Sequence, residues 1–342
     1  MVKKTQKNMR SKVKLGKHTK KRVRNSRVRV IETSKIMTDK DISDKEGEYF
    51  PESHYNIVVK EDADVYGIDD DGSKKLLLRF RKNVIPKELC KLGMENLKKA
   101  AMKKHDNRGA AAGFLDMSKM PKYANDPKQF VKRSKFRIHG YISRDTGKHV
   151  TNSIGNLSMS NIIGYFDRYD RNIKSVPGNR APPCRTTAFT SQQVSKWKNV
   201  IPLIRVIDRQ FKRLIPDRYR IQYQRAHQNP FVIKYTAFST LTINYNWRTA
   251  LHKDAGDLKQ GYGNLVVLED PGERKYEGGY TGFPQYGVCV DVRDGDFLAM
   301  DVHEWHCNTE ITPVSEEKGY SRLSLVAYLR EGMIKCKDLK LN

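Results

Sequence analysis

The chain has 342 residues, with 65 Lys and Arg against 39 Asp and Glu, so its formal net charge at pH 7 is +26. Apolar residues make up 38% of it, enough for a packed core in one large domain or two of ordinary size. No apolar run reaches the roughly 18 residues of a membrane-spanning helix, and the polar, basic start argues against a secretion signal. The charge favours a polyanionic partner, and we expect nucleic acid rather than a membrane.

The cysteines are odd in number, scattered, and include no CxxC pair. We therefore expect neither a disulfide framework nor a cysteine-built zinc site. A reducing compartment is the expected location. They are Cys90, Cys184, Cys289, Cys307 and Cys336.

The first thirty residues hold thirteen Lys or Arg and no acid. Such a run buries too little apolar surface to offset its ordering entropy, which predicts a disordered basic arm over residues 1–31. The arm also fits a nuclear localisation signal, with a merely solubilising tail as the alternative. Further on, Glu61–Gly72 contains pieces of a calcium loop, but its glycine and closing glutamate are misplaced. A hairpin turn at 70–72, between strands at 55–66 and 76–80, is the preferred interpretation.

Two segments have helical spacing of apolar residues, Pro86–Lys104 and Gln192–Leu214. Between them, Asn107–Gly113 is a small-residue loop without a nucleotide-cradle pattern, and we expect its backbone to approach a substrate closely. Ser160–Phe166 is predicted as a buried strand.

After Pro230 the pattern changes to short β-rich runs separated by glycine-bearing turns, which predicts an antiparallel sandwich or barrel. The expected strands are 232–245, 265–269, 287–292, 296–300 and 321–328.

Within this region lies a His-x-Asp motif, His252 and Asp254. Alternation along an extended strand puts both side chains on one face, where an imidazole and a carboxylate can share one metal ion. A second histidine would complete the facial triad of non-haem Fe(II) oxygenases, and both His303 and His306 are candidates. Arg322, among apolar strand residues, needs an anionic partner, and its planar fork suits a carboxylate.

Residues 160–333 resemble the TET/JBP family of Fe(II)- and 2-oxoglutarate-dependent oxygenases, which oxidise the methyl group of 5-methylcytosine or thymine in DNA. Compact fungal and algal members and the JBP oxygenase domain are the most similar. The segments that carry the resemblance are SNIIGYFDR (160–168), CRTTAFT (184–190), TINYNWRTALHKDAGD (242–257), GNLVVLE (263–269), residues 278–287, GDFLAMDVHEWHCN (295–308) and RLSLVAYLR (322–330).

The resemblance implies an α+β fold with a double-stranded β-helix (jelly-roll, cupin-like) core flanked by helices. It places an N-terminal α+β extension at 32–159 and the dioxygenase domain at 160–335. It assigns Fe(II) to His252, Asp254 and His306, with His303 outside the ligand set, and assigns the 2-oxoglutarate carboxylate to Arg322.

Five further residues have roles that follow from the resemblance. Asn244 and Arg248 are expected near 2-oxoglutarate or the substrate. Asp257, Tyr328 and Arg330 are expected to contact an extruded base, although TET proteins have a histidine where Arg330 stands. A turn residue at 257 and a core aromatic at 328 are the structural alternatives, and Trp247 and Trp305 are expected to be packing residues.

The expected function is hydroxylation of a 5-methylpyrimidine in DNA, in a nuclear or other DNA-containing compartment. Two alternatives remain open: a 2-oxoglutarate oxygenase that acts on RNA or protein, and a non-catalytic nucleic-acid-binding protein with an oxygenase fold. The sequence does not distinguish the two bases or define an oligomeric state.

Overall fold

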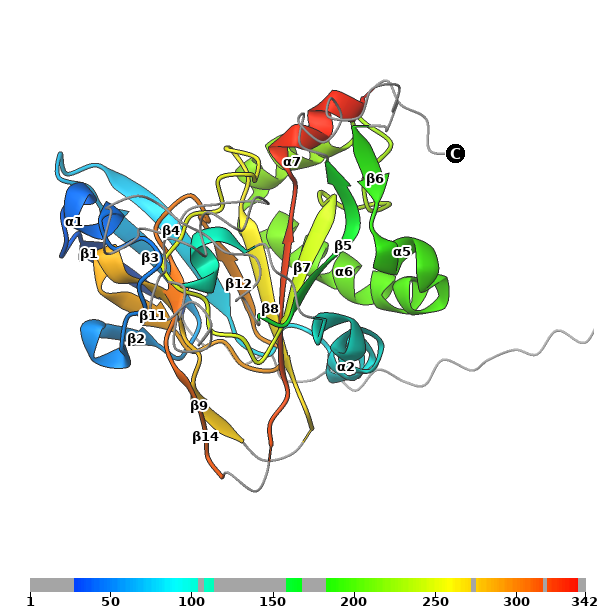
Figure 1. Ribbon diagram of the computed structural model, residues 1–342. Helices are drawn as coiled ribbons and strands as arrows, with labels where there is room; N and C mark the ends of the chain where they lie inside the picture. The colour runs from blue at the N-terminus through cyan, green and yellow to red at the C-terminus, as the bar shows by residue number, and fades with distance from the viewer. Residues whose placement is uncertain are drawn as a thin grey trace, which may run out of the picture.

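The computed structural model describes residues 28–103, 108–113, 158–167, 183–271, 275–315 and 319–337. Two sheets form its core, and their strands interleave distant parts of the chain (Figure 1). In sheet order, the nine-stranded sheet consists of β1 (Arg29–Ser34), β3 (Ala63–Ile68), β4 (Lys74–Arg81), β12 (Phe297–Met300), β8 (Gly263–Glu269), β15 (Arg322–Tyr328), β7 (Thr240–Tyr245), β5 (Ser160–Asp167) and β6 (Cys184–Thr186).

A smaller sheet of four strands completes the core. It consists of β13 (Cys307–Asn308), β10 (Thr281–Phe283), β11 (Val288–Val290) and β2 (Ile57–Val59). A separate pair joins β14 (Ile311–Pro313) to β9 (Tyr276–Gly278).

Helices cover one face of the large sheet. The long ones are α2 (Lys87–Ala101) and α6 (Val194–Leu214), which bury apolar stripes against the sheet, and α7 (Pro216–Ala226) follows α6. The short helices are α1 (Asp39–Ser43), α5 (Ala188–Gln192), and the 3-10 turns η1 (Glu52–His54), η2 (Gly109–Ala112), η5 (Pro284–Tyr286) and η6 (Glu331–Cys336).

Alternation along each strand separates the two faces of the large sheet. In β15, Leu323 and Leu325 join the helix-facing core, whereas Arg322 and Ser324 line a cavity on the opposite face. That opposite face also packs against the small sheet through a second apolar cluster, which includes Val267 of β8. The predicted double-stranded β-helix flanked by helices is therefore confirmed.

The N-terminal region differs from expectation in two respects. Strand β1 begins at Arg29 and pairs in parallel with β3, so residues 29–31 belong to the sheet and not to the predicted arm. The rest of that arm, residues 1–27, lies outside the described residues. The predicted extension supplies strands to both sheets, because β4 pairs with β12 and β2 pairs with β11. Its strands are thus continuous with the sheets of the core.

The hairpin turn predicted at 70–72 is present in the structure. The hairpin of β3 and β4 turns at 69–73, where Gly72 adopts a φ of +80° and the amide of Asp69 donates to the carbonyl of Ser73. The predicted turn is confirmed, and the conformation explains the glycine.

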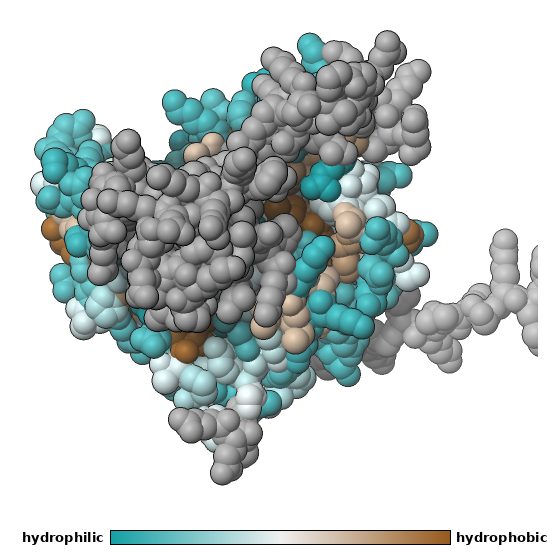
Figure 2. Space-filling view, in the orientation of Figure 1, coloured by the Kyte–Doolittle hydropathy of each residue, from teal (hydrophilic) through white to brown (hydrophobic). Residues whose placement is uncertain are grey.

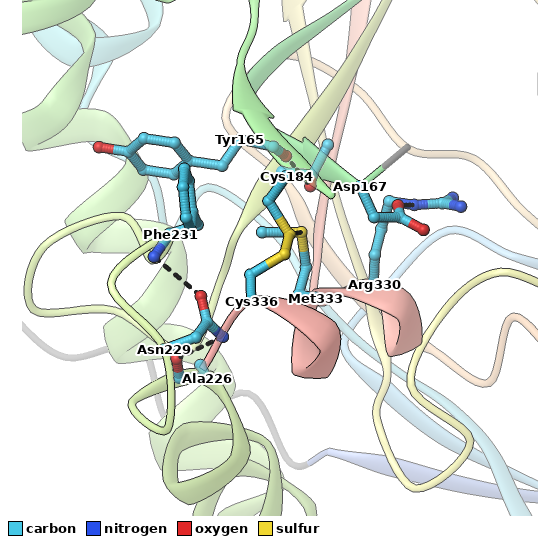
Figure 3. The surroundings of a disulfide bond; sticks show 10 residues. Tyr165, Asp167, Cys184, Ala226, Asn229, Phe231, Arg330, Met333 and Cys336 are labelled. Carbon is cyan, nitrogen blue, oxygen red and sulfur yellow. Dashed lines mark hydrogen bonds and ion pairs between the residues drawn. A yellow bond between two sulfur atoms is a disulfide. The ribbon is translucent and has the colours of Figure 1, made fainter. Parts of the chain in front are cut away.

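The cysteine prediction was wrong for one pair. Cys184 and Cys336 form a buried disulfide with a Cα–Cα distance of 6.0 Å, although 152 residues separate them (Figure 3). Pairing of β6 with β5 and the return of the chain through η6 bring them together, which no spacing motif reveals. The other three cysteines are free and buried.

The described surface in the view of Figure 2 is mostly hydrophilic, with small separate apolar spots. Among the described residues, no helix is both long and apolar enough to cross a membrane.

Candidate active site

Three potential metal ligands converge at one place in the structure. His252, Asp254 and His306 each offer a ligand atom, and these atoms all lie within 4.8 Å of one another. The Nε2 atoms of His252 and His306 lie 3.7 and 3.8 Å from the two carboxylate oxygens of Asp254. Two imidazoles and one carboxylate in this arrangement form the donor set of a facial triad.

Backbone pairing explains why residues 54 positions apart in sequence meet. The amide of His252 donates to the carbonyl of His306, and the amide of His306 donates back, both at 3.1 Å. Two residues on, the amide of Asp254 donates to the carbonyl of Val302 at 3.0 Å. The ladder therefore fixes the register of all three side chains.

Both imidazoles are oriented by main-chain carbonyls. Nδ1 of His252 lies 2.8 Å from the carbonyl of Ala250, and Nδ1 of His306 lies 2.9 Å from that of Glu304. A protonated Nδ1 that donates to these carbonyls leaves Nε2 free to bind metal, the usual arrangement for metal-binding histidines. Burial and the adjacent His252 lower the pKa of His306 to about 4, so its ring is neutral at pH 7.

His303, the alternative ligand of the sequence analysis, lies outside this cluster. Its Nδ1 is 3.1 Å from the carboxylate of Asp301, and that hydrogen bond raises its pKa. His306, and not His303, therefore lies close enough to His252 and Asp254 to share one metal ion with them.

Arg322 is 2% exposed and lines the same cavity as the three clustered residues. Its Nη2 donates to the carbonyl of Gly279 at 3.2 Å, and its Nε has no hydrogen-bond partner among the described residues. Gly279 has a φ of +72°, and a Cβ built there would lie 3.5 Å from that Nε. A buried guanidinium with an unused donor is suited to an anion.

The cavity has a volume of about 680 Å³, within the range of small-ligand sites. Two of its lining residues are joined by a hydrogen bond: the side-chain amide of Asn244 donates to Ser324 at 3.4 Å, and the hydroxyl of Ser160, in the neighbouring strand β5, donates to the side-chain carbonyl of Asn244. Asn244 therefore lies in the cavity as expected. Arg248 does not line it; its guanidinium donates to the carbonyls of Phe50 at 3.0 Å and Asn308 at 3.2 Å.

The three expected base contacts also line the cavity. The hydroxyls of Tyr328 and Thr242 lie 3.0 Å apart, and burial raises the pKa of Tyr328. Burial and the carboxylate of Asp254 raise the pKa of Asp257, while Arg330 opposes the shift. Asp257 pairs with Arg330 through an isolated antiparallel bridge, so the segment that follows Asp254 is joined to the segment that follows β15.

The lining residues that sequence reasoning did not single out include Arg108, Phe166 and Asp167. The guanidinium of Arg108 donates to Ser160, and burial lowers its pKa. The small-residue loop at 107–113 was the available signal, because Gly109, Ala110 and Ala111 of this loop also line the cavity. Asp167 had no signal, since its partner Arg330 is 163 residues away.

Part of the chain is similar to known proteins. The family model Tet_JBP, the oxygenase domain of the 2OGFeDO superfamily, matches residues 165–331. Thymine dioxygenase JBP1-B of Trypanosoma cruzi (strain CL Brener) is 35% identical over 185 residues, covering 52% of this chain and 20% of that protein. Thymine dioxygenase JBP1 of Trypanosoma brucei brucei is 36% identical over 174 residues, 51% of this chain and 19% of that protein.

A solved structure of NgTET1 in complex with 5mC DNA is similar at a TM-score of 0.44 and 15% identity, covering 88% of this chain and 93% of that one. The chain spans about a fifth of the length of the two JBP1 relatives described above.

A double-stranded β-helix with two histidines and a carboxylate opening on a buried arginine defines a 2-oxoglutarate- and Fe(II)-dependent oxygenase domain. Residues 165–331 of the chain match the family model of the TET/JBP oxygenase domain.

Proposed function

We propose that this protein is a dioxygenase that hydroxylates the methyl group of thymine or 5-methylcytosine in DNA, using Fe(II) and 2-oxoglutarate. The observation that carries the proposal is the convergence of His252, Asp254 and His306 in one cavity with Arg322. The names of the JBP1 relatives favour a methylpyrimidine as the substrate.

The residues present fit both the metal and the cosubstrate. His252, Asp254 and His306 would hold Fe(II), because their nitrogen and oxygen donors suit it and the two rings are already oriented by main-chain carbonyls. Arg322 would hold the distal carboxylate of 2-oxoglutarate, which supplies the partner that its Nε lacks. Asn244 lies one strand away and offers an amide to the same region.

Fe(II) with 2-oxoglutarate and oxygen supplies the oxidising power to insert one oxygen atom into a methyl C–H bond, with succinate and carbon dioxide as co-products. The protein's own contribution is position and exclusion of water. Arg322 orients the cosubstrate, the apolar side chains of Leu265, Met300 and Val326 line the cavity beside it, and the β-helix walls keep the site rigid.

The part of the cavity lined by Asp257, Tyr328 and Arg330, here called the nucleotide end, is proposed to receive the base. A methyl group inside a duplex cannot reach the metal end, so the nucleotide must be turned out of the stack at a cost of a few kcal/mol. Asp257 and Arg330 offer an acceptor and donors to the base edge, and Tyr328 offers a ring. The net charge of +26 favours phosphate contacts that would offset the cost of extrusion, and it supports a nuclear or other DNA-containing compartment.

The direct test is an assay with purified protein, Fe(II) and 2-oxoglutarate on three matched oligonucleotides. The first contains 5-methylcytosine and the second contains thymine. The third has uracil and cytosine as its only pyrimidines. We expect succinate in step with hydroxymethylated nucleoside on at least one methylated substrate and no coupled product on the third. Absence of product on both methylated substrates contradicts the proposal.

The same assay separates the alternatives. Succinate release stimulated by methylated RNA but not by DNA indicates an RNA oxygenase. Salt-sensitive DNA binding without iron binding or succinate release indicates a non-catalytic binding protein.

A further inference from the structure

An ion pair between Asp167 and Arg330 forms part of the cavity lining. Asp167 is the last residue of β5, and Arg330 follows the end of β15 by two residues. Nε of Arg330 donates to a carboxylate oxygen of Asp167, and the two side chains are only 14% and 9% exposed. The guanidinium also lies 4.4 Å from the ring centroid of Phe166. One side chain of β5 therefore pairs with the guanidinium, and its neighbour supports the guanidinium with an aromatic ring.

Two glycines leave the room that this pair needs. A Cβ at Gly256, two residues after the proposed ligand Asp254, would lie 2.7 Å from a terminal nitrogen of Arg330. A Cβ at Gly332 would lie 2.1 Å from a carboxylate oxygen of Asp167. The guanidinium is thus confined against Gly256, and the carboxylate is confined against η6.

A covalent link joins the two segments that carry the pair. Cys184 lies directly opposite Asp167 in the β5–β6 ladder. Cys336 is the last residue of η6, the turn that begins immediately after Arg330. The disulfide between them ties the end of β5 to the segment that follows β15, and Figure 3 shows it beside the Asp167–Arg330 pair.

We propose that Asp167 is a positioning residue that fixes Arg330 against the extruded base, and that the Cys184–Cys336 disulfide fixes the two segments that carry them. This inference rests on the proposed function, because it needs a nucleotide in the cavity. A long arginine side chain loses much rotamer freedom when it binds a ligand, so a carboxylate that holds it in place beforehand lowers that loss. Arg330 would touch the base, while Asp167 acts through Arg330.

The central test is Asp167→Asn, with Asp64→Asn as its matched control. Asp64 pairs with Arg81 at 2.8 Å, both side chains are similarly buried, and neither lines the cavity. We expect Asp167→Asn to raise the KM for methylated DNA by about 10-fold while kcat and the KM for 2-oxoglutarate stay within about 2-fold. Asp64→Asn should leave all three constants within about 2-fold of wild type.

Two further variants reach the pair without changing either charge. Gly332→Ala pushes on the carboxylate of Asp167, whereas Gly319→Ala meets no atom within 4 Å. The double variant Cys184→Ala with Cys336→Ala removes the disulfide between the two segments. We expect Gly332→Ala and the double variant to raise the KM for DNA without changing kcat, and Gly319→Ala to behave as wild type.

A second readout does not depend on turnover. Fluorescence of 2-aminopurine placed beside the target base reports extrusion of that base, and it is measured here without 2-oxoglutarate. We expect wild type and Asp64→Asn to give the full signal and Asp167→Asn to need about 10-fold more protein for half of it.

The outcomes distinguish this inference from the proposed function. If wild type gives both product and an extrusion signal but Asp167→Asn matches Asp64→Asn in both assays, the positioning role is wrong and the function stands. If wild type gives neither product nor signal, the proposed function fails and this inference fails with it. A Gly332→Ala protein that loses kcat while its KM is unchanged also contradicts the positioning role.

Discussion

The two ends of the cavity are built in different ways. At the metal end, where we propose that His252, Asp254 and His306 hold Fe(II), the His252–His306 bridge fixes two of the three side chains, and Arg322 stands on a central strand of the nine-stranded sheet. At the nucleotide end, Asp167 and Arg330 lie just where strands β5 and β15 finish, and the disulfide and two glycine contacts hold them. Strand pairing fixes the chemistry, whereas residues at the margins of the sheet shape the part that would meet the base.

This difference predicts where substitutions act. Changes at the metal end should abolish or weaken every turnover, whatever the substrate. Changes at the nucleotide end should alter affinity for DNA and leave the use of 2-oxoglutarate intact.

The largest effect is expected for His306→Ala. Loss of one of three protein ligands should weaken Fe(II) binding by more than about 100-fold, because even loss of a supporting contact outside the ligand set costs up to that much. Titration with Fe(II) under anaerobic conditions measures it. His303→Ala serves as the matched control, since His303 lies outside the ligand cluster. Equal loss in both variants would contradict the assignment.

A smaller effect is expected for Arg322→Lys. The lysine keeps the charge but loses the planar fork, which should raise the KM for 2-oxoglutarate by about 10- to 100-fold and leave the KM for DNA nearly unchanged. Arg248→Lys tests the second arginine expected near the cosubstrate, which the structure places outside the cavity. It should change the KM for 2-oxoglutarate by less than about 2-fold, and a rise equal to that of Arg322→Lys would refute this separation.

Asp257→Asn should act only at the nucleotide end. The amide keeps one acceptor oxygen but turns the second oxygen into an NH₂ donor, so a contact between that second oxygen and the base edge is lost and the KM for methylated DNA should rise by about 5- to 10-fold. Steady-state kinetics with DNA and 2-oxoglutarate varied in turn would show the effect. An equal rise in the KM for 2-oxoglutarate would mean that the two ends are not separate.

The smallest expected effect is on stability. Mn(II), a redox-stable substitute for Fe(II), should raise the melting temperature by a few degrees when present at about 100 times its dissociation constant. Asp254→Asn should remove most of this shift because it replaces a charged ligand with a neutral amide. A shift that persists in Asp254→Asn would show that the metal binds elsewhere.

Sequence reasoning captured the metal end because its signals are local. His252 and Asp254 are two residues apart on an extended segment, and Arg322 stands out among apolar strand neighbours. The choice between His303 and His306 needed the resemblance, and the structure adds the backbone bridge that brings His306 to His252.

Sequence reasoning identified only some residues of the nucleotide end, for a physical reason. Asp257, Tyr328 and Arg330 came from the resemblance, but Asp167 acquires its role through a partner at the far end of the domain. The disulfide was missed for the same reason, since 152 residues of chain must fold before Cys184 and Cys336 meet. Arg248 differs in the opposite sense: its sequence neighbourhood suggested a role near the cosubstrate or the substrate, yet its guanidinium donates to main-chain carbonyls and is not part of the cavity lining.

The proposed function depends on one chemical statement: oxygen from O₂ is inserted into a pyrimidine methyl group as 2-oxoglutarate is consumed. Turnover under ¹⁸O₂ with methylated DNA, followed by mass spectrometry of nucleosides and succinate, tests it directly. The account predicts one labelled atom in the hydroxymethyl nucleoside and one in succinate. Label in succinate alone, with an unmodified nucleoside, would contradict it.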